Sequence, residues 1–269
     1  PTLIGSTPSD DSVVTESPKL DWADSDNGAP YKLQISYSDD FTSPLLEAAG
    51  IQESEYSPSG LTSGKCYYWR VLTANAVPTG EWSSPFSFMF AGPASDDSFE
   101  TDLRGSGARN AWSARGATVP EIVGGDASDG SYSLKLVQTD TITGDVTVET
   151  AVTLDSPKVL RYSYKVESVV ESDSSPTFLR FERYSLHNGS WETRSDYPMS
   201  HTGGAWARAV ELIPAGTHRI RWYFRRTAAN KSPGSCALLD DLRFEEPQPF
   251  EDEDFETLDA RGRTKQAWG

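Results

Sequence analysis

Short stretches in which apolar or aromatic residues alternate with polar ones recur along the whole chain. Examples are residues 31–35 (YKLQI), 67–71 (YYWRV), 160–166 (LRYSYKV) and 220–224 (IRWYF). Successive side chains of a β-strand point to opposite faces, so each stretch places its apolar residues on one face. No pattern of helical spacing lasts for three turns, and clusters of Gly, Pro, Asn and Ser separate the stretches. The alternation therefore predicts an all-β protein.

Two interruptions of this alternation divide the chain into three segments. One lies at residues 92–95 (GPAS) and the other at residues 247–249 (PQP), and Pro with small residues is typical of linkers. The length of 269 residues corresponds to about two domains. We expect one domain over residues 1–92, a larger one over 96–247, and a tail or further repeat over 250–269.

The third segment repeats the opening of the second. Phe255-Glu256-Thr257 and Trp268 match Phe99-Glu100-Thr101 and Trp112 at one offset of 156 residues. Self-similarity at a fixed period is the signature of repeated modules. We therefore expect the tail to begin another copy of the second domain in a tandem array. The alternative is a chance resemblance within an acidic tail.

Charge and composition argue against several function classes. The chain carries 24 Lys and Arg against 40 Asp and Glu, a net charge of −16, which disfavours nucleic acid and anionic membranes as partners. No apolar run is long enough for membrane insertion. There are three His, and the Gly-rich phosphate motifs and the Gly-x-Ser-x-Gly motif do not occur. Among 40 carboxylates some pairs lie close by chance, so acids alone do not indicate a glycosidase. We expect a protein that is not an enzyme.

The first segment contains Leu20-Asp21-Trp22, an alternating run at 31–36, the stretch 61–71 (LTSGKCYYWRV) and Gly80-Glu81-Trp82-Ser83. This set resembles a bacterial fibronectin type III domain, which is a β-sandwich. The resemblance implies a tyrosine corner, in which the hydroxyl of Tyr67 bonds back to the chain upstream. It also implies a spacer or protein-contact role.

Alternation assigns the faces of this first sandwich. We expect the core to contain Trp22, Leu33, Ile35, Tyr67, Trp69 and Val71. We expect the outward positions to be Cys66, Tyr68 and Arg70. The two cysteines, Cys66 and Cys236, fall in different segments, so we expect free thiols.

The second segment opens with residues 96–100 (DDSFE), continues through a Gly-rich stretch at 124–134 and closes with 236–244 (CALLDDLRF). This opening and ending resemble jelly-roll domains of the MAM and cleaved-adhesin type. The resemblance implies a secreted or cell-surface bacterial protein. The expected architecture is all-β, a fibronectin type III-like β-sandwich followed by a larger jelly-roll β-sandwich.

The same resemblance implies a calcium site between the first and last strands, with Glu100 and Asp240 as ligands. Calcium takes six to eight oxygen ligands, and Asp126 or Asp129 in the Gly-rich turn would add to them. Alternation leaves the register open: Asp240 faces inward if Leu238 and Leu242 do, whereas an inward Leu239 makes Asp241 the candidate. Solvated carboxylates are the structural alternative in so acidic a chain.

Four residues of the second segment are candidates for a ligand site. Carbohydrate-binding sandwiches stack sugar rings on exposed Trp or Tyr and hold the hydroxyls with charged or amide side chains. The candidates of these types are Trp191, Trp206, Arg221 and Tyr223. The alternative is a core role for each aromatic, with Trp206 and Trp222 as hairpin neighbours across the turn at 214–217.

Basic residues also alternate outward on these strands. They are Arg161, Lys165, Arg219, Arg221 and Arg225. We expect them to pair with acids such as Glu182 and Glu211 on a solvated face, where each pair contributes little. An acidic glycan as their ligand is the alternative.

The leading interpretation is a non-catalytic segment of a large extracellular bacterial surface protein, an adhesive or spacer module with a calcium-stabilised jelly roll. Its expected partners are a glycan or a cell-surface protein, and it would act as a monomer within a longer multi-domain chain. The alternative is a carbohydrate-binding accessory region of a polysaccharide-degrading enzyme. A third interpretation is glycan hydrolysis by this segment itself, for which no pair of acids is singled out.

Overall fold

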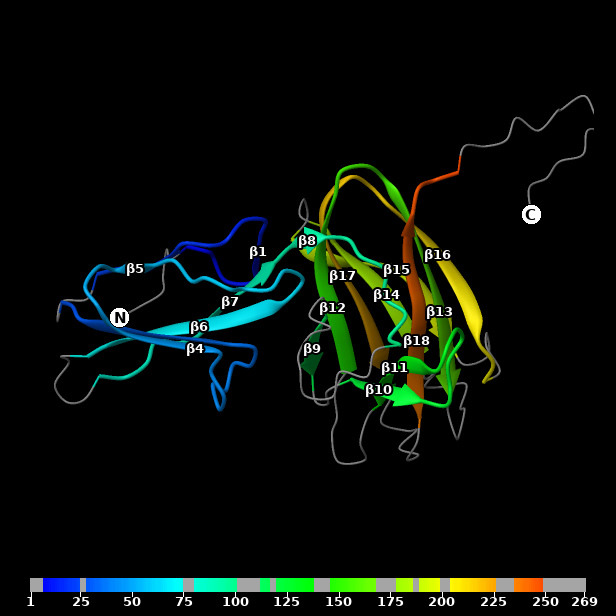
Figure 1. Ribbon diagram of the computed structural model, residues 1–269, viewed down its shortest axis with the longest axis horizontal. Helices are drawn as coiled ribbons and strands as arrows, with labels where there is room; N and C mark the ends of the chain where they lie inside the picture. The colour runs from blue at the N-terminus through cyan, green and yellow to red at the C-terminus, as the bar shows by residue number, and fades with distance from the viewer. Residues whose placement is uncertain are drawn as a thin grey trace, which may run out of the picture.

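The computed structural model describes residues 7–24, 28–74, 80–100, 112–116, 120–137, 146–167, 178–185, 189–198, 204–225 and 235–248. All regular elements in these ranges are β-strands, so the all-β prediction is confirmed. No helix in these ranges is long and apolar enough to cross a membrane. The strands group into two bodies that lie side by side (Figure 1). We call them the N-terminal sandwich, with β1 to β7, and the C-terminal sandwich, with β8 to β18.

The N-terminal sandwich consists of a five-stranded and a two-stranded sheet. The larger sheet has the order β1-β7-β6-β3-β4, with β1 Ser12–Val14, β3 Tyr31–Ser36, β4 Leu46–Ile51, β6 Cys66–Thr73 and β7 Phe86–Phe90. The smaller sheet pairs β2 (Leu20–Asp21) with β5 (Glu55–Tyr56). Neighbouring strands are antiparallel except β1 and β7, which are parallel.

The core of the N-terminal sandwich contains every residue that alternation placed there. The buried cluster is Leu20, Trp22, Tyr31, Leu33, Ile35, Tyr67, Trp69, Val71 and Phe88. The hydroxyl of Tyr67 donates to the carbonyl oxygen of Thr62 at 3.0 Å and accepts from the Thr62 amide at 2.7 Å. The upstream bond expected of Tyr67 is therefore confirmed.

The C-terminal sandwich consists of two larger sheets. One has the order β10-β11-β18-β13-β16, with β10 Glu121–Gly124, β11 Tyr132–Val137, β18 Cys236–Glu245, β13 Lys158–Glu167 and β16 Ala207–Ile213. The other has the order β15-β14-β17-β12-β8, with β15 Ser190–Pro198, β14 Phe178–Ser185, β17 Gly216–Arg225, β12 Val146–Leu154 and β8 Gly92–Pro93. Strand β9 (Ser113–Gly116) also pairs with β12.

Apolar side chains from both sheets meet in one core. Its largest fully buried members include Trp222, Tyr162, Phe99, Phe181 and Phe224. Those that lie on strands, Tyr162, Phe181, Trp222 and Phe224, alternate with residues of the outer faces, as period-two sequence patterns require. The core lies between the two sheets of this sandwich, so each sheet has one inner face and one outer face.

The expected hairpin between Trp206 and Trp222 is wrong. Strand β16, which follows Trp206, belongs to the five-stranded sheet, whereas β17, with Trp222, belongs to the six-stranded sheet. The two-residue connection at Pro214 and Ala215 thus crosses from one sheet to the other. Trp222 is fully buried in the core between them.

The segment expected as a linker takes part in a sheet. Gly92 and Pro93 pair in parallel with Val152 and Thr153 of β12. A Cβ added to Gly92 would overlap the side chain of Ser63, so only glycine allows this close approach. The bounds of the two expected domains stay a prediction.

A small apolar cluster joins the two sandwiches. It contains Cys66, Met89 and Ala91 from the N-terminal side and Ala151 of β12. The outward direction expected of Cys66 is correct with respect to its own core, but the C-terminal sandwich buries this side chain. Two polar bonds cross the same joint. The Cys66 amide donates to Ser113 Oγ at 2.7 Å, and Lys65 Nζ donates to the Trp112 carbonyl at 2.6 Å. Cys66 and Cys236 are both thiols and share no disulfide bond, as expected.

Candidate functional site

Of the four expected calcium ligands, Asp126 and Asp129 belong to one loop, and Glu100 and Asp240 bond to it. Residues 125–131, which we call the braced loop, connect β10 to β11. The carboxylate of Asp240 on β18 accepts hydrogen bonds at Oδ2 from the amides of Ser128 and Asp129, at 2.7 and 3.0 Å. Ser128 Oγ also donates to Ser163 Oγ at 2.8 Å. These bonds hold the loop against the outer face of the five-stranded sheet.

Asp240 is fully buried beneath this loop. Burial raises the pKa of its carboxyl group, while the hydrogen bonds from the amides of Ser128, Asp129 and Asp241 act in the opposite direction. A buried carboxylate is tolerated because these N–H groups satisfy it. The loop and Asp240 thus depend on each other.

A β-bulge decides the register that the sequence left open. Asp241 has a φ of +51°, and the pairing of β13 with β18 shifts between Arg161 and Ser163. The extra residue in β18 makes two residues three positions apart, one on each side of the bulge, face the same side of the sheet. Leu239 and Leu242 therefore both join the core, and Asp240 lies on the outer face. Neither of the two expected registers describes this arrangement.

Glu100 holds the other end of the braced loop. Its carboxylate accepts from the amide of Ser131 at 2.9 Å and from the amide of Tyr132 at 3.0 Å. Gly130 between the two carboxylates has a φ of +68°, and a Cβ there would overlap the Glu100 carboxyl group. Glycine is therefore required here both for its backbone conformation and for space.

The other two acids bind different partners. Asp126 accepts from Lys165 Nζ at 2.8 Å and from the indole Nε1 of Trp206 at 3.0 Å. Asp129 lies 3.4 Å from the guanidinium of Arg243. Trp206 is thus tied to the braced loop and lies away from the other three ligand candidates.

Glu100 and Asp240 carry the carboxylate oxygens that calcium prefers as ligands, and in this structure these oxygens accept from amides of the loop and of Tyr132. Asp240 accepts from the amide of Asp129 and Glu100 accepts from the amide of Ser131, two residues further along the loop. Over the ranges that the structure describes, however, no three His, Cys, Asp or Glu side chains gather into a metal-binding group. A cation here would rely on backbone and solvent oxygens beyond these two carboxylates.

Three of the four ligand candidates lie together on the outer face of the six-stranded sheet. The guanidinium of Arg221 lies 3.9 Å from the ring centroid of Trp191 and bonds Glu182 at 2.6 Å. Tyr223 follows two residues along β17, with Arg180 5.3 Å from its ring centroid. We call this set, with Tyr184, the aromatic–arginine face: Arg180, Glu182, Tyr184, Trp191, Arg221 and Tyr223.

The residues of this face differ in accessibility. Trp191 and Arg221 are partly exposed, whereas Tyr223 is buried beneath the arginines around it. Arg180 bonds Asp196 as well as lying near Tyr223. A ligand would therefore meet the Trp191 ring and the side chains of Arg180 and Arg221, and the buried Glu182 and Tyr223 would support them from below.

Sequence reasoning missed the role of Arg219. This arginine was expected on a solvated face, but it is fully buried at the joint. It bonds Asp11 of the N-terminal sandwich at 3.1 Å and Glu149 of β12 at 3.3 Å. No local pattern points to a partner 208 residues away. The expected pairing of Glu182 is confirmed by Arg221, but Glu211 is buried and accepts instead from the hydroxyls of Ser195 and Tyr197.

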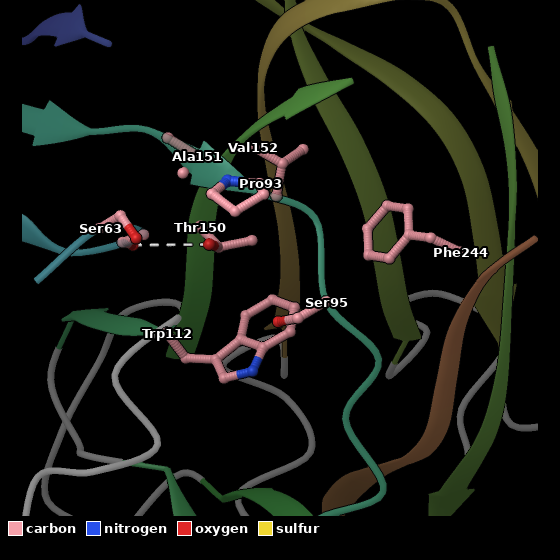
Figure 2. A pocket seen from close by; sticks show the side chains of 10 residues that line it. Ser63, Pro93, Ser95, Trp112, Thr150, Ala151, Val152 and Phe244 are labelled. Carbon is pink, nitrogen blue, oxygen red and sulfur yellow. Dashed lines mark hydrogen bonds between the residues drawn. The ribbon is translucent and has the colours of Figure 1, made fainter. Parts of the chain in front are cut away.

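A pocket lies between the two sandwiches (Figure 2). Its wall includes Ser63, Trp112, Thr150 and Phe244, and Thr150 Oγ1 lies 3.5 Å from the Gly64 carbonyl. None of its ten lining residues is charged. The pocket therefore offers hydroxyl groups and two aromatic rings.

No protein-family model and no curated protein sequence matches the chain. Among solved structures, the CBM22-1 xylan-binding domain of Paenibacillus barcinonensis Xyn10C is similar at 18% identity and a TM-score of 0.37, over 59% of this chain and 99% of that one. The K2 cleaved adhesin domain of Lys-gingipain, from Porphyromonas gingivalis, is similar at 15% identity and a TM-score of 0.42, over 56% and 99%. These values assign neither a family nor a ligand.

Proposed function

We propose that the chain is a non-catalytic binding segment of a large extracellular bacterial protein, with the N-terminal sandwich as spacer and the C-terminal sandwich as adhesive module. The position of Arg219 supports this best. Its guanidinium bonds Asp11 of the spacer and lies 5.1 Å from the ring centroids of both Tyr184 and Trp191. Because the joint and the aromatic–arginine face share this buried side chain, the spacer fixes the orientation of the face.

A glycan is the ligand class that this face favours. Sugar rings stack on aromatic side chains, and their hydroxyls bond charged groups set beside the ring. Trp191 supplies a partly exposed ring and Arg221 supplies donors next to it, while Glu182, which is buried, holds Arg221 in place. An accessory region of a polysaccharide-degrading enzyme would use the same face, so the two interpretations differ only in the rest of the protein.

A glycan array and a pull-down with insoluble polysaccharides test this proposal. We expect specific binding that Trp191→Ala abolishes. Trp206→Ala is the matched control, because it removes the same side chain from the opposite sheet. Thermal melts of both variants check that they are folded. Absence of binding by the wild type, or equal loss in both folded variants, would leave a spacer that contacts proteins.

The proposal includes a calcium ion beside the braced loop, with Glu100 and Asp240 as its carboxylate ligands. The support for it is that both carboxylates already hold this loop, through neighbouring amides. Bound calcium would add neutralising charge next to the buried Asp240 and tie the first residues of the sandwich to its last strand. It would supply no catalytic step.

A further inference from the structure

Two exposed apolar side chains lie on β16, the edge strand of the five-stranded sheet in the C-terminal sandwich. Val210 is 55% exposed and Leu212 is 60% exposed, and both belong to β16. Their neighbours Ala209 and Ile213 point into the core, so Val210 and Leu212 share the outer face. Val159 of β13 pairs with Leu212 and is partly buried. We call Val159, Val210 and Leu212 the edge patch.

The edge patch lies where the chain leaves the C-terminal sandwich. Val159 pairs with Leu212 on one side and with Glu245, the last residue of β18, on the other. In Figure 1, β13, β16 and β18 lie on the side of this sandwich away from the N-terminal sandwich. The chain thus enters through one sheet, at β8, and leaves through the other.

The N-terminal sandwich has a comparable row of side chains at the end of its last strand. Met89 of β7 pairs with Cys66 on one side and Val13 on the other. Here the following sandwich covers the row, and Ala151 packs against Met89 and Cys66. Where the structure contains a next module, the apolar side chains at the exit of the preceding one are buried by it.

The residues that follow β18 resemble those that follow β7. The offset of 156 residues places Pro249 at Pro93 and Phe255 at Phe99. Pro93 lies in β8, and Phe99 is in the core of the C-terminal sandwich. Phe99 follows the end of β7 by nine residues and Phe255 follows the end of β18 by ten, and this similar spacing predicts a joint of the same kind.

We propose that the edge patch is the docking surface for a further copy of the C-terminal sandwich, the one whose opening sequence occupies residues 250–269. The counterpart of Ala151 in that copy would cover Leu212 and Val159. Glu245 and Glu246 border the patch, where they bond Arg161 and Lys158. Their charge is already paired, so the docking rests on the apolar contact. This inference rests on the modular array of the proposed function but not on its ligand.

The test uses the full chain extended after Gly269 by a copy of residues 114–248, because the offset aligns Gly269 with Ser113. Hydrogen exchange and small-angle X-ray scattering compare this extended chain with the 269-residue chain. We expect amides of β16 to exchange about tenfold more slowly in the extended chain, since exchange there would need the joint to open. Leu212→Asp should restore fast exchange and enlarge the radius of gyration.

Leu45→Asp is the control, because Leu45 is a comparably exposed leucine, at 47%, on the N-terminal sandwich. It should change neither measurement. Exchange of β16 that is equal in the two chains would overturn the proposal. An added copy that does not fold would also count against it, because the inference requires this sandwich to complete the repeat. Loss of glycan binding alone would leave it standing.

Discussion

Arg219 bonds both the carboxylate and the backbone carbonyl of Asp11, each at 3.1 Å, across the joint between the two sandwiches. The same guanidinium lies 3.3 Å from Glu149, which is fully buried. Removing one partner of a buried ion pair leaves the other charge in a poorly solvated site. The joint is therefore held by a charged group whose loss affects both sandwiches.

Arg219→Ala should lower the free energy of unfolding by about 3–5 kcal/mol, because it leaves the buried Glu149 carboxylate without this cation. Asp11→Ala should cost less, about 1 kcal/mol, because the Asp11 side chain is half exposed and its carbonyl bond remains. Urea unfolding measures both. Arg194→Ala, an exposed arginine on β15, is the control. Equal stability of Arg219→Ala and this control would contradict the role of the joint.

Two glycines of the braced loop allow a matched comparison. Gly125 and Gly130 both have positive φ, +85° and +68°. A Cβ on Gly125 would meet nothing within 4 Å, whereas one on Gly130 would displace the Glu100 carboxylate from its amide partners. Gly125→Ala should cost about 1 kcal/mol for the backbone conformation. Gly130→Ala should cost about 1–2 kcal/mol more. Thermal or urea unfolding that gives equal costs would argue against bracing by Glu100.

Alternation in the sequence predicted the direction of side chains in regular strands. Tyr67, Trp69 and Val71 are in the core as alternation requires, because side-chain direction in a regular strand is a local property. Alternation did not predict side-chain direction in β18, where one extra residue interrupts the two-residue period. The bulge at Asp241 uses a positive φ at a non-glycine residue, and this gives no signal in the pattern. The inner and outer faces of β18 were therefore assigned incorrectly.

Contacts between distant segments were the other part that sequence reasoning could not supply. Alternation correctly predicts that Cys66 and Arg219 face away from the cores of their own sandwiches. Each is nevertheless buried, because the other sandwich covers it. Trp206 and Trp222 were paired across a short turn because such turns usually form hairpins, whereas this one crosses between sheets. Of the four ligand candidates, Trp206 alone was misplaced relative to the others.

Calcium should stabilise the chain at neutral pH if Glu100 and Asp240 bind it. Binding to the folded state adds RT ln(1 + [L]/Kd), about 2.7 kcal/mol at a hundredfold excess over Kd. We expect the melting temperature to rise in calcium and fall in chelator, and Asp240→Asn to abolish the difference. Glu121→Gln, an exposed acid on β10, should retain it. No chelator effect on the wild type would remove calcium from the proposed function.

Alkaline pH should unfold the C-terminal sandwich through its buried tyrosines. Burial raises the pKa of Tyr197 to about 12 from 10.0, and its hydroxyl lies 2.8 Å from that of Tyr162, whose pKa burial also raises. Between pH 10 and 12 the unfolded chain loses these protons while the folded chain keeps them. The free energy of unfolding therefore falls as pH rises through this window and is unaffected below it. Tyr197→Phe should reduce the slope measured by urea unfolding. A slope unchanged in Tyr197→Phe would assign the alkaline transition to other groups.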